Sequence, residues 1–169
     1  MASPKASPRA GGSKAAPARR PAKRAVSKAG TVRRPPAGFV LPPHPSHFRE
    51  LIGPVFMRRM PRKPPTALRF GLYVQPKHGN RSGNLHGGAV ATLADIAMGY
   101  GCAYSARPML RLVTVSLSVD YIGSADLGDW IEARIDVIRT GRRVAFAQCD
   151  VWNGRKRIAR ASASFLVVG

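Results

Sequence analysis

The second half of the chain alternates between apolar and polar side chains, which is the pattern of strands with one buried face. Every second side chain between residues 113 and 121 is apolar, and three further runs follow at 131–137, 144–152 and 158–168. The turns between these runs are short: they lie at residues 123–128, at 141–142 and at 153–154, where Asn-Gly is a strong hairpin signal. The pattern therefore predicts four antiparallel strands.

A helical pattern precedes these strands. Residues 86–105 carry apolar or small side chains on nearly every side, which predicts a helix buried nearly all round. Residues 66–74 are typical of a first strand, and apolar residues from 48 to 56 predict a short amphipathic helix that ends near Arg58 and Arg59. This order predicts an α+β fold in which a curved antiparallel sheet wraps around one long central helix.

Charge separates a tail from the body of the chain. Of the 28 Lys and Arg residues, ten lie in residues 1–38, which hold no acidic residue; the net charge of the whole chain is +20. This Ala/Pro/Lys/Arg-rich segment lacks large apolar side chains, so we expect it to be disordered. A linker with the short helix at 39–65 and one folded domain at 66–169 follow. The tail is either a solvated extension or a weak contact for nucleic acid or anionic surfaces.

The remaining composition excludes several classes of protein. No segment approaches the ~20 apolar residues of a membrane span, and no apolar signal region follows Met1. The prolines of the tail argue against the amphipathic helix of a mitochondrial transit peptide. Cys102 and Cys149 are too few for a disulfide framework or a zinc site. We therefore expect a cytoplasmic protein with no transmembrane segment, no metal and no other cofactor.

One carboxylate, Asp95, lies alone among the small and apolar residues of the predicted helix. Burying an unpaired charge costs on the order of several kcal/mol, which favours a functional use of this residue. The alternative is a structural carboxylate paired with an arginine. Cys102 lies seven residues later on roughly the same helix face, where it is either a nucleophile or, more in keeping with its apolar setting, a small buried side chain.

The residues that open this helix resemble those of a known family. Segment 80–88 reads Asn-Arg-Ser-Gly-Asn-Leu-His-Gly-Gly, and Asp95 follows the histidine by nine positions. This spacing resembles the signature of hotdog-fold acyl-CoA thioesterases of the phenylacetic-acid-degradation type, which carry a His-Gly-Gly motif. The resemblance extends from residue 66 to 168 and includes the strand order. It implies a hotdog fold and hydrolysis of an acyl-CoA substrate to free acid and coenzyme A.

The resemblance also implies roles for individual residues. Asp95 would act as nucleophile or general base, and Gly87 would present its backbone N–H to the thioester carbonyl. Asn80 would orient that carbonyl or the attacking water, and Thr114 would assist the water, although Thr114 also fits an ordinary strand position. His86 would hold the loop through its side chain rather than transfer a proton.

Physical chemistry supports this reading of the helix start. Unpaired N–H groups there stabilise an oxyanion, and glycine at positions 87 and 88 lets a carbonyl approach the backbone closely. We therefore place His86 and Gly88 with the substrate-binding residues. Arg142 and Arg143 lie in a predicted turn and are candidates for binding the phosphates of coenzyme A, or they simply solvate that turn.

The spacing along the helix predicts that subunits share the site. Asp95 lies about 13 Å from His86 along a helix, at ~1.5 Å per residue, too far to act on a carbonyl held at Gly87 of its own chain. We therefore expect an obligatory homodimer that joins Gly87 of one subunit to Asp95 of another, and we favour a tetramer. The alternative function is a non-catalytic acyl-CoA-binding or nucleic-acid-associated hotdog protein, which would not need Asp95. A hotdog dehydratase would need a catalytic His with an acid near the helix, and that pattern is missing.

Overall fold

The computed structural model describes residues 33–61 and 68–168, which belong to one compact unit, Val32–Gly169. Residues 1–32, most of the predicted tail, and residues 62–67 lie outside the described residues. The elements in chain order are α1 (His47–Ile52), β1 (Phe56–Arg59), β2 (Leu68–Tyr73), the short 3₁₀ helix η1 (Pro76–His78), α2 (Gly87–Ala103), β3 (Arg111–Tyr121), β4 (Trp130–Thr140), β5 (Val144–Asn153) and β6 (Lys156–Val168).

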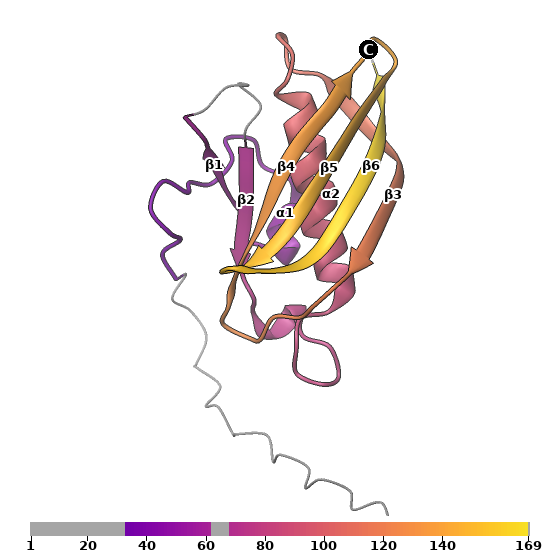
Figure 1. The fold of residues 1–169 in the computed structure, drawn as a ribbon. Coiled ribbons are helices and arrows are strands. Elements are labelled where there is room, and N and C mark those ends of the chain that lie inside the picture. The colour runs from indigo at the N-terminus through magenta and orange to yellow at the C-terminus, as the bar shows by residue number, and fades with distance from the viewer. Residues whose placement is uncertain (1–32, 62–67, 169) are drawn as a thin grey trace, which may run out of the picture. The chain divides into compact units, whose positions relative to one another are not determined.

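The six strands of the described chain form one antiparallel sheet that curves around α2 (Figure 1). The strand order is β1-β2-β4-β5-β6-β3, so β3, the strand after the helix, lies at one edge. The core between sheet and helix contains the fully buried side chains of Phe70, Leu93, Met98, Ile131 and Phe165. The predicted α+β architecture is confirmed.

The long helix is buried on one face and not, as predicted, nearly all round. Val90, Leu93, Ala97 and Met98 are almost inaccessible to solvent, whereas the face that carries Asp95 is only half buried. Where the helix meets the sheet, a Cβ atom on Gly101 would lie 2.8 Å from the Cγ2 atom of Ile135. Glycine therefore lets helix and sheet pack closely there, at the expense of intrinsic helix propensity.

The predicted end of the short first helix is wrong. α1 ends at Ile52 and not near Arg58, because Gly53 and Pro54 follow and proline cannot continue a helical hydrogen-bond ladder. The next apolar residues form β1 instead, an edge strand that pairs with β2, Phe56 opposite Gly71. In a run as short as β1, the spacing of apolar residues does not distinguish a strand from one turn of helix, which is why the sequence pattern also fitted a helix.

The turn between β5 and β6 lies one residue later than predicted. Asn153 pairs with Lys156, so the two turn residues are Gly154 and Arg155, and Gly154 has a positive φ of 59°. The Asn153 side chain is used elsewhere: its Nδ2 atom donates to Asp129 Oδ2 at 2.7 Å and ties this strand to the loop before β4.

The last residues of the predicted tail that the structure describes contact the sheet. The Arg33 guanidinium lies 4.4 Å from the Tyr73 ring centroid and donates to the Gly128 carbonyl at 2.9 Å. Phe39, the first residue after the predicted tail, is buried against Trp130, with ring centroids 5.0 Å apart. The disorder of the tail as a whole stays a prediction. Among the described helices, none has the length and apolar content needed to cross a membrane.

Candidate active site

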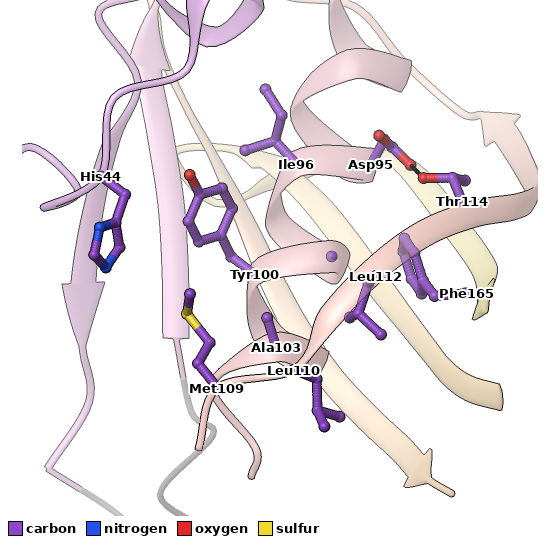
Figure 2. A pocket seen from close by; sticks show the side chains of 11 residues that line it. His44, Asp95, Ile96, Tyr100, Ala103, Met109, Leu110, Leu112, Thr114 and Phe165 are labelled. Carbon is purple, nitrogen blue, oxygen red and sulfur yellow. Dashed lines mark hydrogen bonds between the residues drawn. The ribbon is translucent and has the colours of Figure 1, made fainter. Parts of the chain in front are cut away.

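Asp95 projects from the middle of α2 toward the first residues of β3 (Figure 2). Thr114 Oγ1 donates a hydrogen bond of 2.9 Å to Asp95 Oδ1. Within the described residues no Lys or Arg forms an ion pair with Asp95, so the structure contains no arginine partner for a purely structural carboxylate. One carboxylate oxygen is therefore held by a neutral hydroxyl group and not by a basic side chain.

A β-bulge positions Thr114. The register of β3 against β6 shifts between Thr114 and Ser116, so Val115 has no partner residue on β6. A bulge turns neighbouring side chains out of their regular direction and is common beside active sites. Here it lies directly after the residue whose hydroxyl group reaches the helix.

Asp95 and Thr114 lie at one end of an apolar groove of about 310 Å³. The groove follows the C-terminal half of α2, past Ile96 and Gly99, and Figure 2 shows His44, Tyr100 and Met109 on the side away from Asp95. The remaining lining is mostly apolar: Ala103, Leu110, Leu112 and Phe165. A groove with a carboxylate at one end and hydrocarbon along its length suits an acyl chain whose reactive carbonyl lies at the carboxylate.

The start of α2 presents one unpaired backbone donor. Within the described chain the N–H groups of Gly88, Ala89 and Val90 all bond to His86: the first to its Nδ1 atom at 2.8 Å, the others to its carbonyl oxygen. The N–H of Gly87 has no hydrogen-bond partner among the described residues. His86 therefore caps the helix, and Gly87 keeps the donor that an oxyanion requires.

Tyr121, at the end of β3, closes against this helix start. Its hydroxyl group donates to the Gly87 carbonyl at 3.1 Å, and a Cβ atom on Gly87 would lie 3.2 Å from its ring. A Cβ atom on Gly88 would lie 3.0 Å from the His86 ring. The two glycines therefore leave room for the Tyr121 and His86 rings.

Asn80 folds the loop before the helix. Its Oδ1 atom accepts hydrogen bonds from the backbone N–H groups of Ser82, at 2.9 Å, and Asn84, at 3.1 Å. Side-chain bonds of this kind stabilise tight turns. Neither Asn80 nor residues 86–88 line the groove that holds Asp95 and Thr114. Within one chain the predicted site residues therefore form two separate groups.

Arg142 and Arg143 are exposed in the turn between β4 and β5, at the end of the sheet where α2 ends (Figure 1). The Arg143 carbonyl accepts the N–H of Val167, and Val167 pairs with Leu112, two residues before Thr114. The turn thus lies near Leu112, which lines the groove, and away from Gly87 of the same chain.

Two functional candidates were not found from the sequence. Tyr100 lines the groove together with Ile96. The two residues are four positions apart, and this spacing places them on the same face of the helix, which was visible in the sequence. His78 is 3% exposed; its Nδ1 atom accepts the Gln75 N–H at 3.0 Å and its Nε2 atom bonds to the Ile52 carbonyl. Burial lowers the pKa of His78 below its ordinary value, and this neutral ring links α1 to the loop before α2.

The cysteines take no part in the site. Cys102 is fully buried, and burial raises its pKa to about 11; burial raises the pKa of Cys149 to about 12. Thiols held protonated in this way are poor nucleophiles. The reading of Cys102 as a small buried side chain is confirmed.

Sequence comparison identifies relatives of this chain. A family model described as the thioesterase superfamily matches residues 82–159. The protein named "Putative esterase PA0474" of Pseudomonas aeruginosa is 38% identical over 130 residues, which cover 77% of this chain and 95% of that protein. Acyl-coenzyme A thioesterase 13 of Mus musculus is 32% identical over 91 residues, which cover 53% of this chain and 63% of that protein.

Structural comparison agrees. The crystal structure of zebrafish thioesterase superfamily member 2 matches with a TM-score of 0.64 and 29% identity, covering 75% of this chain and 89% of that one. The E. coli PaaI protein from the phenylacetic acid degradation operon, at 20% identity, shares the fold with a TM-score of 0.64, covering 73% of this chain and 86% of that one. The predicted hotdog fold and resemblance to this family are confirmed.

Proposed function

This chain belongs to the thioesterase superfamily, and from that premise we propose that it hydrolyses an acyl-coenzyme A thioester to the free acid and coenzyme A. The observation that carries the proposal is the Asp95 carboxylate, held by the Thr114 hydroxyl group at the end of an apolar groove. An oriented carboxylate beside a bound acyl group is placed to act on the carbonyl carbon. The name of the mouse relative supports coenzyme A as the leaving group.

The chemistry has two routes that use the same atoms. As a general base, Asp95 takes a proton from a water molecule whose oxygen adds to the thioester carbonyl. As a nucleophile, Asp95 adds to that carbon itself, and water then hydrolyses the resulting anhydride. In both routes the C–S bond breaks, coenzyme A leaves as a thiolate that takes up a proton, and negative charge develops on the carbonyl oxygen. The Gly87 N–H is the donor we assign to that charge.

Two copies of the chain are needed to complete this site. β3 lies at the sheet edge, and its apolar side chains Val113 and Val115 are 54% and 66% exposed. A long edge strand with exposed apolar side chains favours pairing with another strand. A second copy of β3 is the partner we propose.

The contacts of β3 determine what such a pair would bring together. Thr114 lies beside Asp95, and Tyr121 lies beside Gly87. If two β3 strands pair antiparallel about a two-fold axis midway between these positions, Thr114 faces the partner's Tyr121. The partner's Gly87 then lies next to the Asp95 carboxylate. This geometry supports the predicted homodimer; the tetramer stays a prediction.

The remaining site residues have supporting roles in the proposal. The Nδ2 group of Asn80 is the part of that side chain left to orient the carbonyl or the water, since its Oδ1 atom folds the loop. Arg142 and Arg143 are the residues we assign to the phosphates of coenzyme A, from their turn near Leu112. His86 and Gly88 hold the helix start against the substrate.

Hydrolysis of acyl-CoAs tests the proposal directly. We expect the protein to release free thiol from a panel of acyl-CoAs of different chain length and aromatic content. Asp95→Asn keeps the side-chain volume but removes the charge, so turnover is expected to fall by about 10² or more with the fold intact. Asp136→Asn is the matched control, because Asp136 is exposed on β4 and, among the described residues, accepts a side-chain hydrogen bond from Gln148 alone. Wild-type turnover by folded Asp95→Asn protein contradicts the assignment.

We propose a cytoplasmic location, in keeping with the two cysteines, which are free and buried. The basic residues of the first 38 positions are proposed to attract nucleic acid or anionic surfaces weakly, separately from hydrolysis.

A further inference from the structure

Two polar side chains lie beside Met109 at the end of the groove remote from Asp95, and the segment before β1 supplies one of them. His44 and the Tyr100 ring line this end (Figure 2). His44 precedes α1, in a segment that carries none of the family's motif residues. This segment therefore adds a polar side chain to a groove whose lining away from Asp95, Thr114 and Tyr100 is mostly apolar.

A buried arginine stands behind these two residues. Arg49 is 7% exposed; its Nη1 atom donates to the Tyr100 hydroxyl oxygen at 2.7 Å, and its Nη2 atom donates to the His44 carbonyl. No carboxylate of the described residues lies within ion-pair distance of Arg49. A buried guanidinium normally faces an anion, and here it faces two neutral oxygens.

The direction of the Arg49 bond determines what Tyr100 can offer. Because the hydroxyl oxygen accepts from Arg49, the hydroxyl proton is left to donate, and no acceptor for it lies among the described residues. A positive donor polarises the hydroxyl group and strengthens the next bond in the chain. A ligand that ends in a methyl group would leave this donor unpaired, whereas an acceptor would satisfy it.

We propose that the groove selects acyl groups that carry a hydrogen-bond acceptor, a carboxylate or a hydroxyl group, at the end remote from the thioester. Tyr100 is the specificity-determining residue that donates to this acceptor, and Arg49 is the positioning residue behind it. This inference rests on the proposed thioesterase function, since it takes the acyl group to lie in the groove with its carbonyl at Asp95.

Acyl-CoAs of matched chain length test this selection. We compare kcat/KM for substrates that end in a methyl group, a hydroxyl group or a carboxylate. The wild-type protein is expected to favour the polar ends, and Tyr100→Phe to lower that preference about tenfold by lowering kcat/KM for the polar-ended substrates. Tyr104→Phe is the matched control, because the Tyr104 hydroxyl group has no hydrogen-bond partner among the described residues and Tyr104 does not line the groove. An unchanged preference in Tyr100→Phe overturns the proposal.

Arg49 is tested through its effect on Tyr100. Arg49→Met is expected to lower the preference for polar ends when Tyr100 is present and to have no further effect on that preference in Tyr100→Phe protein. A merely structural role would change rates and stability equally in both backgrounds. If Arg49→Met does not fold, Arg49→Lys replaces it, with a smaller loss expected because lysine lacks the guanidinium fork.

The failure of this inference is distinguishable from failure of the proposed function. If no acyl-CoA is hydrolysed, the function is wrong, and thioether analogues with methyl or carboxylate ends then test the groove by calorimetric binding. Tighter binding of the carboxylate-ended analogue, lost in Tyr100→Phe, supports the selection. Equal affinity for both analogues overturns it. Hydrolysis of all substrates without preference overturns the selection alone.

Discussion

The Asp95 carboxylate takes its orientation from one hydroxyl group. Thr114 Oγ1 fixes Oδ1, and the bulge after Thr114 sets the direction from which that bond comes. A hydrogen bond to a charged group contributes about 1.5–3 kcal/mol, enough to favour one carboxylate orientation strongly. In this arrangement Thr114 positions Asp95 in addition to any contact with water.

Replacing Thr114 tests this orientation. Thr114→Val keeps the branched shape but removes the donor, and kcat is expected to fall about tenfold because the carboxylate loses its fixed geometry. Thr114→Ser keeps the hydroxyl group and is expected to retain most of the activity. Steady-state kinetics on one acyl-CoA measure both, and equal rates for Thr114→Val and wild type would show that the bond does not matter.

Among the elements, α1 and the loop before α2 are joined through the neutral ring of His78. Its lowered pKa makes this junction pH-dependent. In the unfolded chain His78 has the ordinary pKa of about 6.5, whereas in the folded chain its pKa is lower. The contribution of the neutral His78 ring to stability is therefore fully present above about pH 6.5, and it is lost as the pH falls toward the pKa of His78 in the folded chain.

Urea unfolding at about pH 7.5 and about pH 5.5 measures this dependence. The free energy of unfolding is expected to be lower at the acidic pH in wild type, and less pH-dependent in His78→Gln, whose side chain does not titrate. His47→Gln, at an exposed position of α1, is expected to keep the wild-type dependence. An undiminished slope in His78→Gln would assign the pH dependence to other groups.

The edge strand β3 and the start of α2 make the shared site testable by mixing variants. Gly87→Pro removes the proposed oxyanion donor at the first helical position, where proline is tolerated. Gly87→Ala is its control, because it adds the same Cβ atom beside the Tyr121 ring but keeps the N–H. Asp95→Asn and Gly87→Pro are each expected to be inactive alone.

Mixing the two inactive proteins in equal amounts is expected to restore about a quarter of wild-type activity. Half of the dimers are then mixed, and one of their two sites holds both intact groups. Exchange of subunits is verified independently by mass spectrometry of the dimers. No recovery despite exchange would place both groups in the site of a single chain.

The whole chain carries a net charge of +20. A chain that begins at Arg33 keeps the Arg33 contacts with Tyr73 and Gly128 and loses eight of the ten basic residues of the predicted tail. We expect it to retain the melting temperature and kcat of the full chain. Its retention on DNA or anionic vesicles is expected to be weaker at low salt and less salt-dependent. A large fall in kcat or melting temperature would show that the first 32 residues belong to the folded enzyme.

Local sequence patterns were sufficient for much of the fold and for singling out Asp95 as a candidate site residue. The last four strands show a period of two, and the helix before them is apolar. Both patterns lie within short stretches of the sequence, so the α+β order could be predicted from the sequence alone. Asp95 and the glycines at the helix start were readable for a similar reason: a lone charge among apolar residues and a helix start without Cβ atoms are visible in one short segment.

Contacts between distant residues decided the rest. β1 was missed because only its pairing with β2 distinguishes its few apolar residues from a helical turn. Arg49 and Tyr100 are 51 positions apart, and no local period connects a residue before β1 with one near the end of α2. The open edge of β3, on which the proposed shared site depends, follows from the strand order. That order is set by how the whole chain buries its apolar faces around α2 and not by the sequence of β3 alone.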